Sequence, residues 1–372
     1  MTESIVTCFE TLKNILTVSG FESRLAGAVK DAVLSLTDGF FHTASVTPRG
    51  SLVFSHRCEN ENAKHLLLDA HFDTVGLVVS QLSDGGFVRC VPVGGIDRRL
   101  LPTAEVIFYG KEALRGVFAS TPPHLAEKNE KETLPEFSEY LVDTGRTKEE
   151  LETLLPVGSP AVFAGESARL LNDRYASAHL DDKICCAAIL ETCRELANEE
   201  TTCHVTVLFS SGEETGAGGA PCAARGLLAD GAVALDVNFA CDKGVPDYSS
   251  APLGAGAMIS RSAVTDRRMT AIVETCACDA AIPHKIIAET EGTGTNADAI
   301  MIAGAGTPCA VLSVPLSYMH TPCEVCDLCD VQAVSDLLVQ LVRRFDALSR
   351  EEQTRLGVRV VKGTNAAKGE RA

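Results

Sequence analysis

Acidic residues and histidines occur together in five short segments that could bind metal ions. These segments are His71-Phe72-Asp73, Asp181-Asp182-Lys183, Glu213-Glu214, Asp236 and Tyr318-Met319-His320. Mixed nitrogen and oxygen ligands suit borderline divalent metals. A carboxylate that bridges two ions, with two further ligands for each ion, is the pattern of a two-metal hydrolytic site. A remaining glutamate could then deprotonate the attacking water.

Three of these segments also have a simpler structural explanation. His71 follows an apolar run and could be a hydrogen-bonded core histidine, although Asp73 could equally fix its tautomer for metal binding. Asp181 and Asp182 precede a predicted helix, where carboxylates can cap the helix N-terminus. His320 stands before a Thr-Pro pair and could be a turn residue.

The other two segments are harder to explain without a cation. Glu213 and Glu214 follow an apolar strand, and two adjacent carboxylates there repel each other and lose hydration. Asp236 interrupts an otherwise apolar predicted strand, so its carboxylate needs a cation or several donors. Taken together, the five segments favour a metal site.

The elements that must position these residues alternate between strand and helix after residue 170. We predict strands over 205–209, 233–239 and 310–315, and helices over 181–196, 220–228, 296–304 and 327–348. This alternation predicts a parallel or mixed sheet with helices on both faces, and sites in such sheets form beyond the carboxyl ends of the strands. Near the N-terminus, residues 4–36 predict one or two amphipathic helices broken at Ser19-Gly20, and 66–73 predict a buried strand that opens into a loop.

The sequence pattern of residues 75–168 differs from that of the rest of the chain. Short β-like stretches such as 86–93 and 104–109 are separated by glycine and proline, and Thr147 with Glu150 forms a capping box before a helix over 148–155. We therefore expect a small, mostly β domain inserted between 1–74 and 169–372.

Composition restricts the kinds of partner. The chain has 372 residues, with 50 acidic and 33 basic residues and a net charge of −17, which argues against nucleic-acid and membrane-surface binding. It has no apolar run of membrane-spanning length and no signal-peptide pattern. Without a signal-peptide pattern, we interpret the fifteen cysteines as free thiols in a reducing compartment. We therefore expect a cytoplasmic protein.

Three cysteines follow a CxxCxxC spacing at Cys323, Cys326 and Cys329. One interpretation is a metal or iron–sulfur site. The other is a set of plain thiols at the start of a helix, which we favour because no fourth thiolate lies nearby in the chain.

The order and surroundings of the five segments resemble the M42 family of metallo-aminopeptidases, which includes glutamyl and deblocking aminopeptidases and members labelled endoglucanase. The resemblance extends over nearly the whole chain. Further motifs that carry it are Ser19-Gly20-Phe21-Glu22, Gly94-Gly95-Ile96-Asp97, Gly116-Val117, Pro122-Pro123-His124-Leu125, Leu253-Gly254-x-Gly256 and Thr295-x-x-Asp298-Ala299.

The resemblance implies two divalent metal ions, for which zinc, cobalt and manganese are all suitable. His71 and Asp236 would hold one ion, Glu214 and His320 would hold the other, and Asp181 would bridge them.

The resemblance also implies that Glu213 is the general base, that Asp73 orients His71, and that Asp182 lies just behind the ligands. The implied fold is a phosphorylase/hydrolase-like three-layer α/β/α sandwich with an inserted PDZ-like β-domain that mediates homo-oligomers, from dimers to dodecamers. The implied activity is removal of N-terminal amino acids from short peptides.

Two other functions remain open from the sequence. A related two-metal fold could act as an amidohydrolase or deacylase, or on glycans. The chain could also be a non-catalytic assembly protein that keeps its metals for structure. Five residues depart from the family pattern, and none of them is an expected ligand: Thr74, Lys183, Gly212, Gly218 and Ser317.

Overall fold

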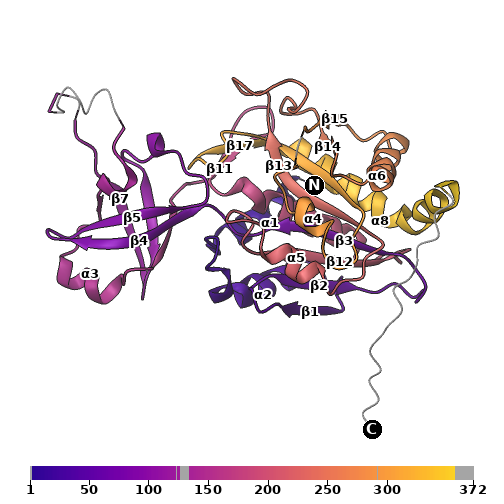
Figure 1. The fold of residues 1–372 in the computed structure, drawn as a ribbon, viewed down its shortest axis with the longest axis horizontal. Helices are drawn as coiled ribbons and strands as arrows, with labels where there is room; N and C mark the ends of the chain where they lie inside the picture. The colour runs from indigo at the N-terminus through magenta and orange to yellow at the C-terminus, as the bar shows by residue number, and fades with distance from the viewer. Residues whose placement is uncertain (1, 123, 126–133, 291, 357–372) are drawn as a thin grey trace, which may run out of the picture.

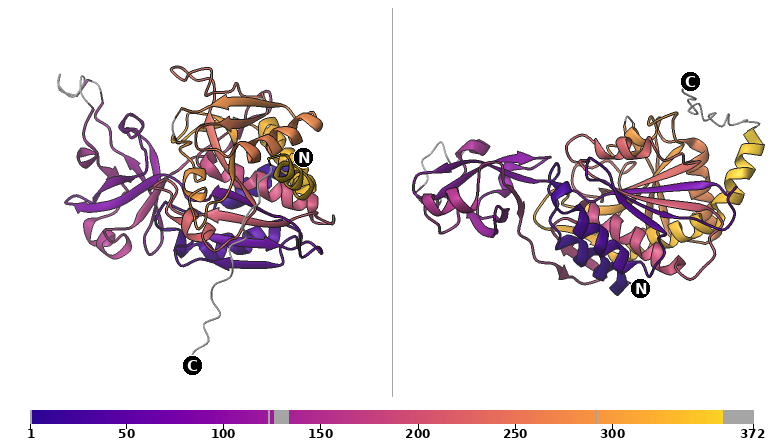
Figure 2. Two further views of the ribbon diagram at one scale, coloured as in Figure 1. Left: turned by 45° about the vertical axis from the view of Figure 1, so that its right-hand side comes forward. Right: turned by 90° about the horizontal axis from the view of Figure 1, so that it is seen from below.

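The computed structural model describes residues 2–122, 124–125, 134–290 and 292–356. Pro123 of the Pro122-Pro123-His124-Leu125 motif therefore lies outside the described residues. Two separate β structures organise this part of the chain, a large mixed sheet and a small closed barrel (Figure 1). Figure 2 shows from two further directions that the barrel stands apart from the large sheet and its helices.

The large sheet has 11 strands within the described residues, nine of them in the order β1-β2-β12-β3-β13-β16-β17-β11-β10. Four central neighbours, β12, β3, β13 and β16, run parallel, so their carboxyl ends reach the same edge of the sheet. The strands are β1 (Thr43–Val46), β2 (Leu52–His56), β3 (His65–His71), β10 (Ala168–Arg169), β11 (Arg174–Ser177), β12 (His204–Ser210), β13 (Gly231–Phe239), β14 (Ala257–Arg261), β15 (His284–Ala288), β16 (Cys309–Ser317) and β17 (Glu324–Asp327).

Helices pack against both faces of this sheet. One face shares a hydrophobic core with α1 (Thr2–Lys13), α2 (Ala26–Leu36), α4 (Leu180–Leu196), α6 (Arg267–Asp279) and α8 (Leu328–Leu356). The other face packs against the short helices α5 (Gly219–Ala224) and α7 (Ala297–Ile300). The fold is therefore a mixed α/β sheet covered by helices on both sides, as the alternation of elements predicts.

The barrel has its own hydrophobic core, built from residues such as Leu77, Phe108 and Val142. The chain enters the barrel after β3 and returns to the large sheet at β10. Around the barrel run β4 (Gly76–Ser83), β5 (Phe87–Val93), β8 (Val142–Asp143), β7 (Ala113–Phe118), β6 (Glu105–Tyr109) and β9 (Pro160–Phe163). Helix α3 (Lys148–Leu154) begins at the predicted capping box, and the remaining short helices are η1 (Glu22–Arg24), η2 (Arg98–Leu100) and η3 (Phe137–Glu139).

The predicted elements after residue 170 are present, but two helices are shorter than expected. Helix α5 ends at Ala224 instead of residue 228, because the chain turns before Gly226, and glycine is a poor helix former. Helix α7 is a single turn, because the chain then bends back through Gly304 and Gly306, which both have positive φ. The unit from β14 through α6 to β15 was not predicted from the sequence.

No helix in the described part of the chain has the length and apolar character needed to cross a bilayer.

Lys183 fastens the start of α4 to the first helix. Its side chain is buried, and Nζ donates hydrogen bonds to the main-chain carbonyls of Leu12 (3.2 Å) and Ile15 (2.7 Å) at the end of α1. Carbonyl groups at a helix C-terminus have no partner within the helix, so this amine satisfies them. Burial lowers the pKa of Lys183 to about 7. The segment that carries Asp181 is thereby tied to α1.

We predict a pH-dependent stability difference between the wild type and Lys183→Met. A lysine in an unfolded chain has a pKa of about 10.4, so between about pH 7 and 10 the unfolded state binds more protons at this residue than the folded state. The wild type should therefore gain stability relative to the variant as the pH rises, by at most about 1.4 kcal/mol per pH unit. Urea unfolding of both proteins at several pH values measures this, and two parallel pH curves would contradict it.

Candidate active site

All five predicted segments meet at the edge of the large sheet where the parallel strands end. His71 is the last residue of β3, and Asp236 lies near the end of β13. Glu213 and Glu214 are in the turn after β12, and His320 follows β16. Asp181 joins them from the start of α4, where the Asp181–Asp182 peptide bond is cis.

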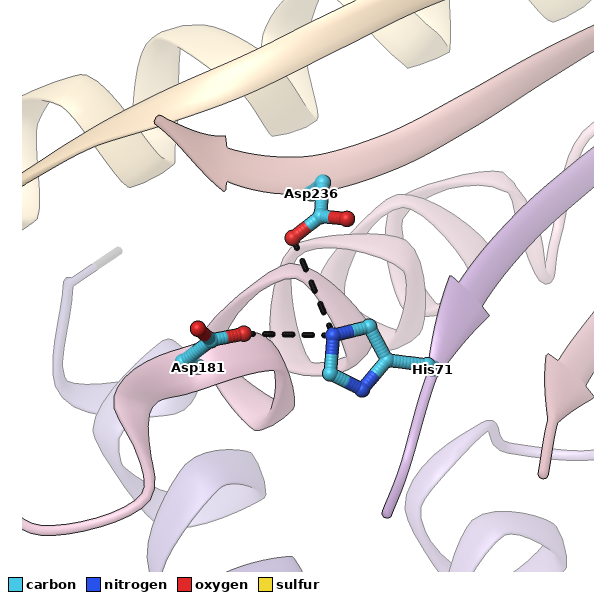
Figure 3. A group of neighbouring side chains, drawn as sticks. All are labelled: His71, Asp181 and Asp236. Carbon is cyan, nitrogen blue, oxygen red and sulfur yellow. Dashed lines mark ion pairs between the residues drawn. The ribbon is translucent and has the colours of Figure 1, made fainter. Parts of the chain in front are cut away.

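The first group of side chains surrounds His71. Its Nε2 atom lies 3.1 Å from Oδ1 of Asp181 and 3.7 Å from Oδ1 of Asp236 (Figure 3). One oxygen of Glu213 lies 3.9 Å from the same nitrogen. His71, Asp181 and Asp236 are close enough together to bind a single metal ion.

The second group surrounds His320. Its Nε2 atom lies 3.0 Å from Oδ2 of Asp181 and 3.4 Å from Oε2 of Glu214. Asp181, Glu214 and His320 are again close enough to hold one ion. Asp181 belongs to both groups, and each of its two oxygens faces a different histidine, which is the geometry of a bridging carboxylate.

The second ring nitrogen of each histidine contacts a main-chain carbonyl. Nδ1 of His71 lies 3.0 Å from the carbonyl oxygen of Asp73, and Nδ1 of His320 lies 3.0 Å from that of Gly95. Such contacts fix the tautomer and turn Nε2 toward the site. Asp73 is thus the residue that contacts Nδ1 of His71, but it does so with its main-chain carbonyl. Its carboxylate, which we expected to make this contact, lies 3.8 Å from Nδ1.

The Asp73 carboxylate instead accepts hydrogen bonds from the backbone N–H groups of Glu213 and Glu214, each at 3.2 Å. In the same turn, the N–H of Gly212 donates to the buried Glu22 carboxylate at 2.7 Å. Gly212 has a φ of 69°, a left-handed conformation that favours glycine. The turn that carries both glutamates is therefore held by carboxylates from two distant segments.

Glu324 is a further buried residue of the site that was not predicted from the sequence. Its two oxygens accept hydrogen bonds from the backbone N–H groups of Asp181 (3.2 Å) and His320 (2.8 Å). Burial raises the pKa of Glu324 to about 8. Asp182 is fully buried, and burial raises its pKa well above the ordinary value. Glu324 therefore supports the backbone of two segments that carry the site.

The electrostatics of the site fit bound cations. Burial, together with neighbouring carboxylates, raises the pKa of Glu213 to about 8 and that of Glu214 to about 9. Burial would lower the pKa of His320, but the hydrogen bond to Asp181 raises it to about 9. Oε1 of Glu214 is buried without a hydrogen-bond partner. Divalent cations would compensate these crowded carboxylates and supply the missing partner.

The three cysteines of the CxxCxxC spacing do not form such a group. Among the residues that the structure describes, the two groups around Asp181 are the only sets of three close side chains suited to a metal ion. Cys326 is buried, whereas Cys323 and Cys329 are exposed. This agrees with their interpretation as plain thiols.

A cavity of about 560 Å³ opens onto the metal-binding groups. One side of it is formed by the site residues, and the other by Asn238, Phe239, Tyr248 and Glu289 together with the loop around Thr293. This volume suits a small ligand or the end of a peptide. A larger cavity of about 850 Å³ lies between α1 and the barrel. None of the predicted site residues lines it, so we assign the candidate active site to the smaller cavity.

Known proteins with similar sequences and folds include several peptidases, and one similar structure is described as a putative peptidase/endoglucanase. A lysyl aminopeptidase from Pyrococcus furiosus is 29% identical over 91% of this chain and 97% of its own length. The aminopeptidase APDkam598 from Desulfurococcus kamchatkensis superposes with a TM-score of 0.86 at 28% identity, covering 97% of this chain and 99% of that one.

A third relative is the TET1 peptidase of Pyrococcus horikoshii, which can assemble into a tetrahedron or a large octahedral shell. It has a TM-score of 0.78 at 29% identity and covers 90% of this chain and 98% of that one. The family model of the M42 glutamyl aminopeptidases matches residues 50–337, and the chain therefore belongs to the M42 peptidase family.

Proposed function

We propose that this M42 peptidase is a metal-dependent aminopeptidase that uses two divalent ions to release N-terminal residues from short peptides. The observation that carries the proposal is the pair of three-residue groups that share Asp181, with Glu213 beside them. His71 and Asp236 would hold one ion, and Glu214 and His320 the other. Zinc is our first choice of metal, since it accepts both histidine and carboxylate ligands.

When bound, the two ions would polarise the scissile carbonyl and lower the pKa of the attacking water. Glu213 takes the proton from this water and passes it to the leaving amine nitrogen. Its side chain suits this role because it lines the cavity and reaches within 3.9 Å of His71, yet belongs to neither three-residue group. Asp73 keeps Glu213 in place by accepting the hydrogen bond from its backbone N–H group.

We further propose that the chain consists of two domains with different functions. Residues 1–74 and 169–372 would form the catalytic domain, a phosphorylase/hydrolase-like three-layer α/β/α sandwich, and 75–168 an inserted PDZ-like domain that mediates self-association. The separate hydrophobic cores of the two parts support this division. We also propose a cytoplasmic location, which the free cysteines support. The glycan-hydrolase alternative is supported by the endoglucanase description of one similar structure, and the aminopeptidase proposal by the family model and the relatives named above.

We predict that Glu213→Gln abolishes turnover without loss of metal. A general base typically contributes about 10²- to 10⁴-fold to the rate, so kcat on an aminoacyl-p-nitroanilide should fall by that factor. The adjacent Glu214→Gln is the matched variant, and it should lose metal as well as activity. Elemental analysis and steady-state kinetics separate the two effects. A Glu213→Gln enzyme with wild-type kcat would exclude Glu213 as the base.

We predict that metal content depends on which ligand is removed. The wild type should bind about two ions per subunit. His320→Ala should keep about one, whereas Asp181→Ala should bind fewer still, because Asp181 belongs to both groups. Asp330→Asn is a suitable control, because this buried carboxylate accepts N–H groups of Gly254 and Gly256 and takes part in neither group. Retention of both ions by Asp181→Ala would contradict the bridging role.

We predict that the protein self-associates in solution. The barrel exposes two valines, Val91 and Val117, each more than 40% exposed, and single apolar side chains of this kind can join an interface. Light scattering should give a mass that is a multiple of the 39.4 kDa subunit. A mass of one subunit at every concentration would contradict the proposed role of the barrel.

A further inference from the structure

The cavity beside the metal-binding groups has a second acidic position. Glu289, just after β15, lines this cavity together with Asp236 and Asn238 of β13. Glu289 belongs to neither three-residue group, so its carboxylate is not one of the expected metal ligands. The position of this carboxylate bears on which N-terminal residue the cavity accepts.

Strand β13 connects Glu289 to the metal-binding groups. Asp236 and Asn238 are two residues apart on this strand, so their side chains point to the same face, and their Cα atoms are about 6.6 Å apart. The side-chain nitrogen of Asn238 donates a hydrogen bond to Oε1 of Glu289 at 3.0 Å. The Glu289 carboxylate is therefore held beside the strand that carries the expected ligand Asp236.

The Glu289 carboxylate has no cationic partner among the described residues. No lysine or arginine of the described chain forms an ion pair with it, and none lines the cavity. Its Oε2 atom is buried without a hydrogen-bond partner. Burial raises the pKa of Glu289, and the neighbouring Asn238 and Ser260 offset only part of this rise. A partly buried carboxylate in this state gains most from a positively charged ligand group.

The remaining walls of the cavity suit a long side chain with an apolar stem. Phe239 is 47% exposed and Tyr248 is 56% exposed, and both line the cavity. Aromatic rings contact the methylene groups of lysine and arginine, and they attract the charged head.

We propose that Glu289 and Asn238 bind the positively charged side chain of the substrate's N-terminal residue, so that the enzyme prefers lysine or arginine at this position. This inference rests on the proposed aminopeptidase function and adds its substrate class. Acidic N-terminal residues are disfavoured, because Glu289 repels them.

The test compares four substrates on the metal-loaded enzyme. These are lysyl-, arginyl-, norleucyl- and glutamyl-p-nitroanilide, and norleucine has the chain length of lysine without its charge. Lysyl and arginyl substrates should exceed the norleucyl substrate in kcat/KM by at least about tenfold, and the glutamyl substrate should be the poorest. Glu289→Gln should remove this preference while changing norleucyl hydrolysis by less than about threefold.

The surface variant Glu199→Gln is the matched control, because Glu199 pairs with Arg343 on the exposed surface and lies away from the cavity. It should leave the lysyl-to-norleucyl ratio unchanged. An equal loss on all substrates in Glu289→Gln would overturn the proposal, since it would assign Glu289 to the common α-amino group or to folding. A wild-type preference for norleucine or glutamate would also overturn it.

Calorimetric titration with free L-lysine and L-norleucine separates this inference from the proposed function. The wild type should bind lysine at least about tenfold more tightly, and Glu289→Gln should bind both equally. A protein that binds lysine in this way but cleaves no aminoacyl substrate would refute the aminopeptidase function and leave side-chain recognition intact. Equal binding of both amino acids by the wild type would refute the recognition itself.

Discussion

Crowding of carboxylates around Asp181 is the constraint on which the rest of the site depends. Four carboxylates and two imidazoles lie within a few ångströms of each other, largely out of contact with water. Buried like charges repel, and each has lost hydration, so this arrangement costs free energy unless protons or cations compensate it. The raised pKa values of Glu213 and Glu214 express that cost. Divalent cations remove it, which is why the same grouping suits two-metal hydrolysis.

A second set of buried carboxylates holds the crowded group in place. Asp73, Glu22 and Glu324 accept hydrogen bonds from backbone N–H groups of the segments that carry the site. A hydrogen bond between neutral groups contributes about 0.5–1.5 kcal/mol, and one to an ionised carboxylate contributes more. Each carboxylate joins segments that are distant in sequence, except that Glu324 also holds the nearby His320. The backbone of the site is thus fixed from behind, and the ligand side chains remain free to meet ions.

The sequence predicted the site residues better than it predicted their supports. Glu213, Glu214 and Asp236 could be found because carboxylates are anomalous in or after apolar strands, and parallel strands bring their ends together. Glu324 gave no such signal, because it stands on a short strand whose contact with Asp181 spans 143 residues. The unit of parallel strands β14 and β15 joined by α6 was missed for a related reason. Its pairing with β16 depends on contacts far along the chain, which local patterns do not record.

The proposed metal ligand Asp236 and the proposed side-chain site at Glu289 lie on different parts of the same sheet. Asp236 and Asn238 lie on β13, which pairs with β16 along its whole length from residue 232, so their spacing is rigid. Glu289 follows β15, which pairs only with β14 and lies off the main path of the sheet. A change at Glu289 can therefore alter the charge of the cavity without moving the ligands on β13.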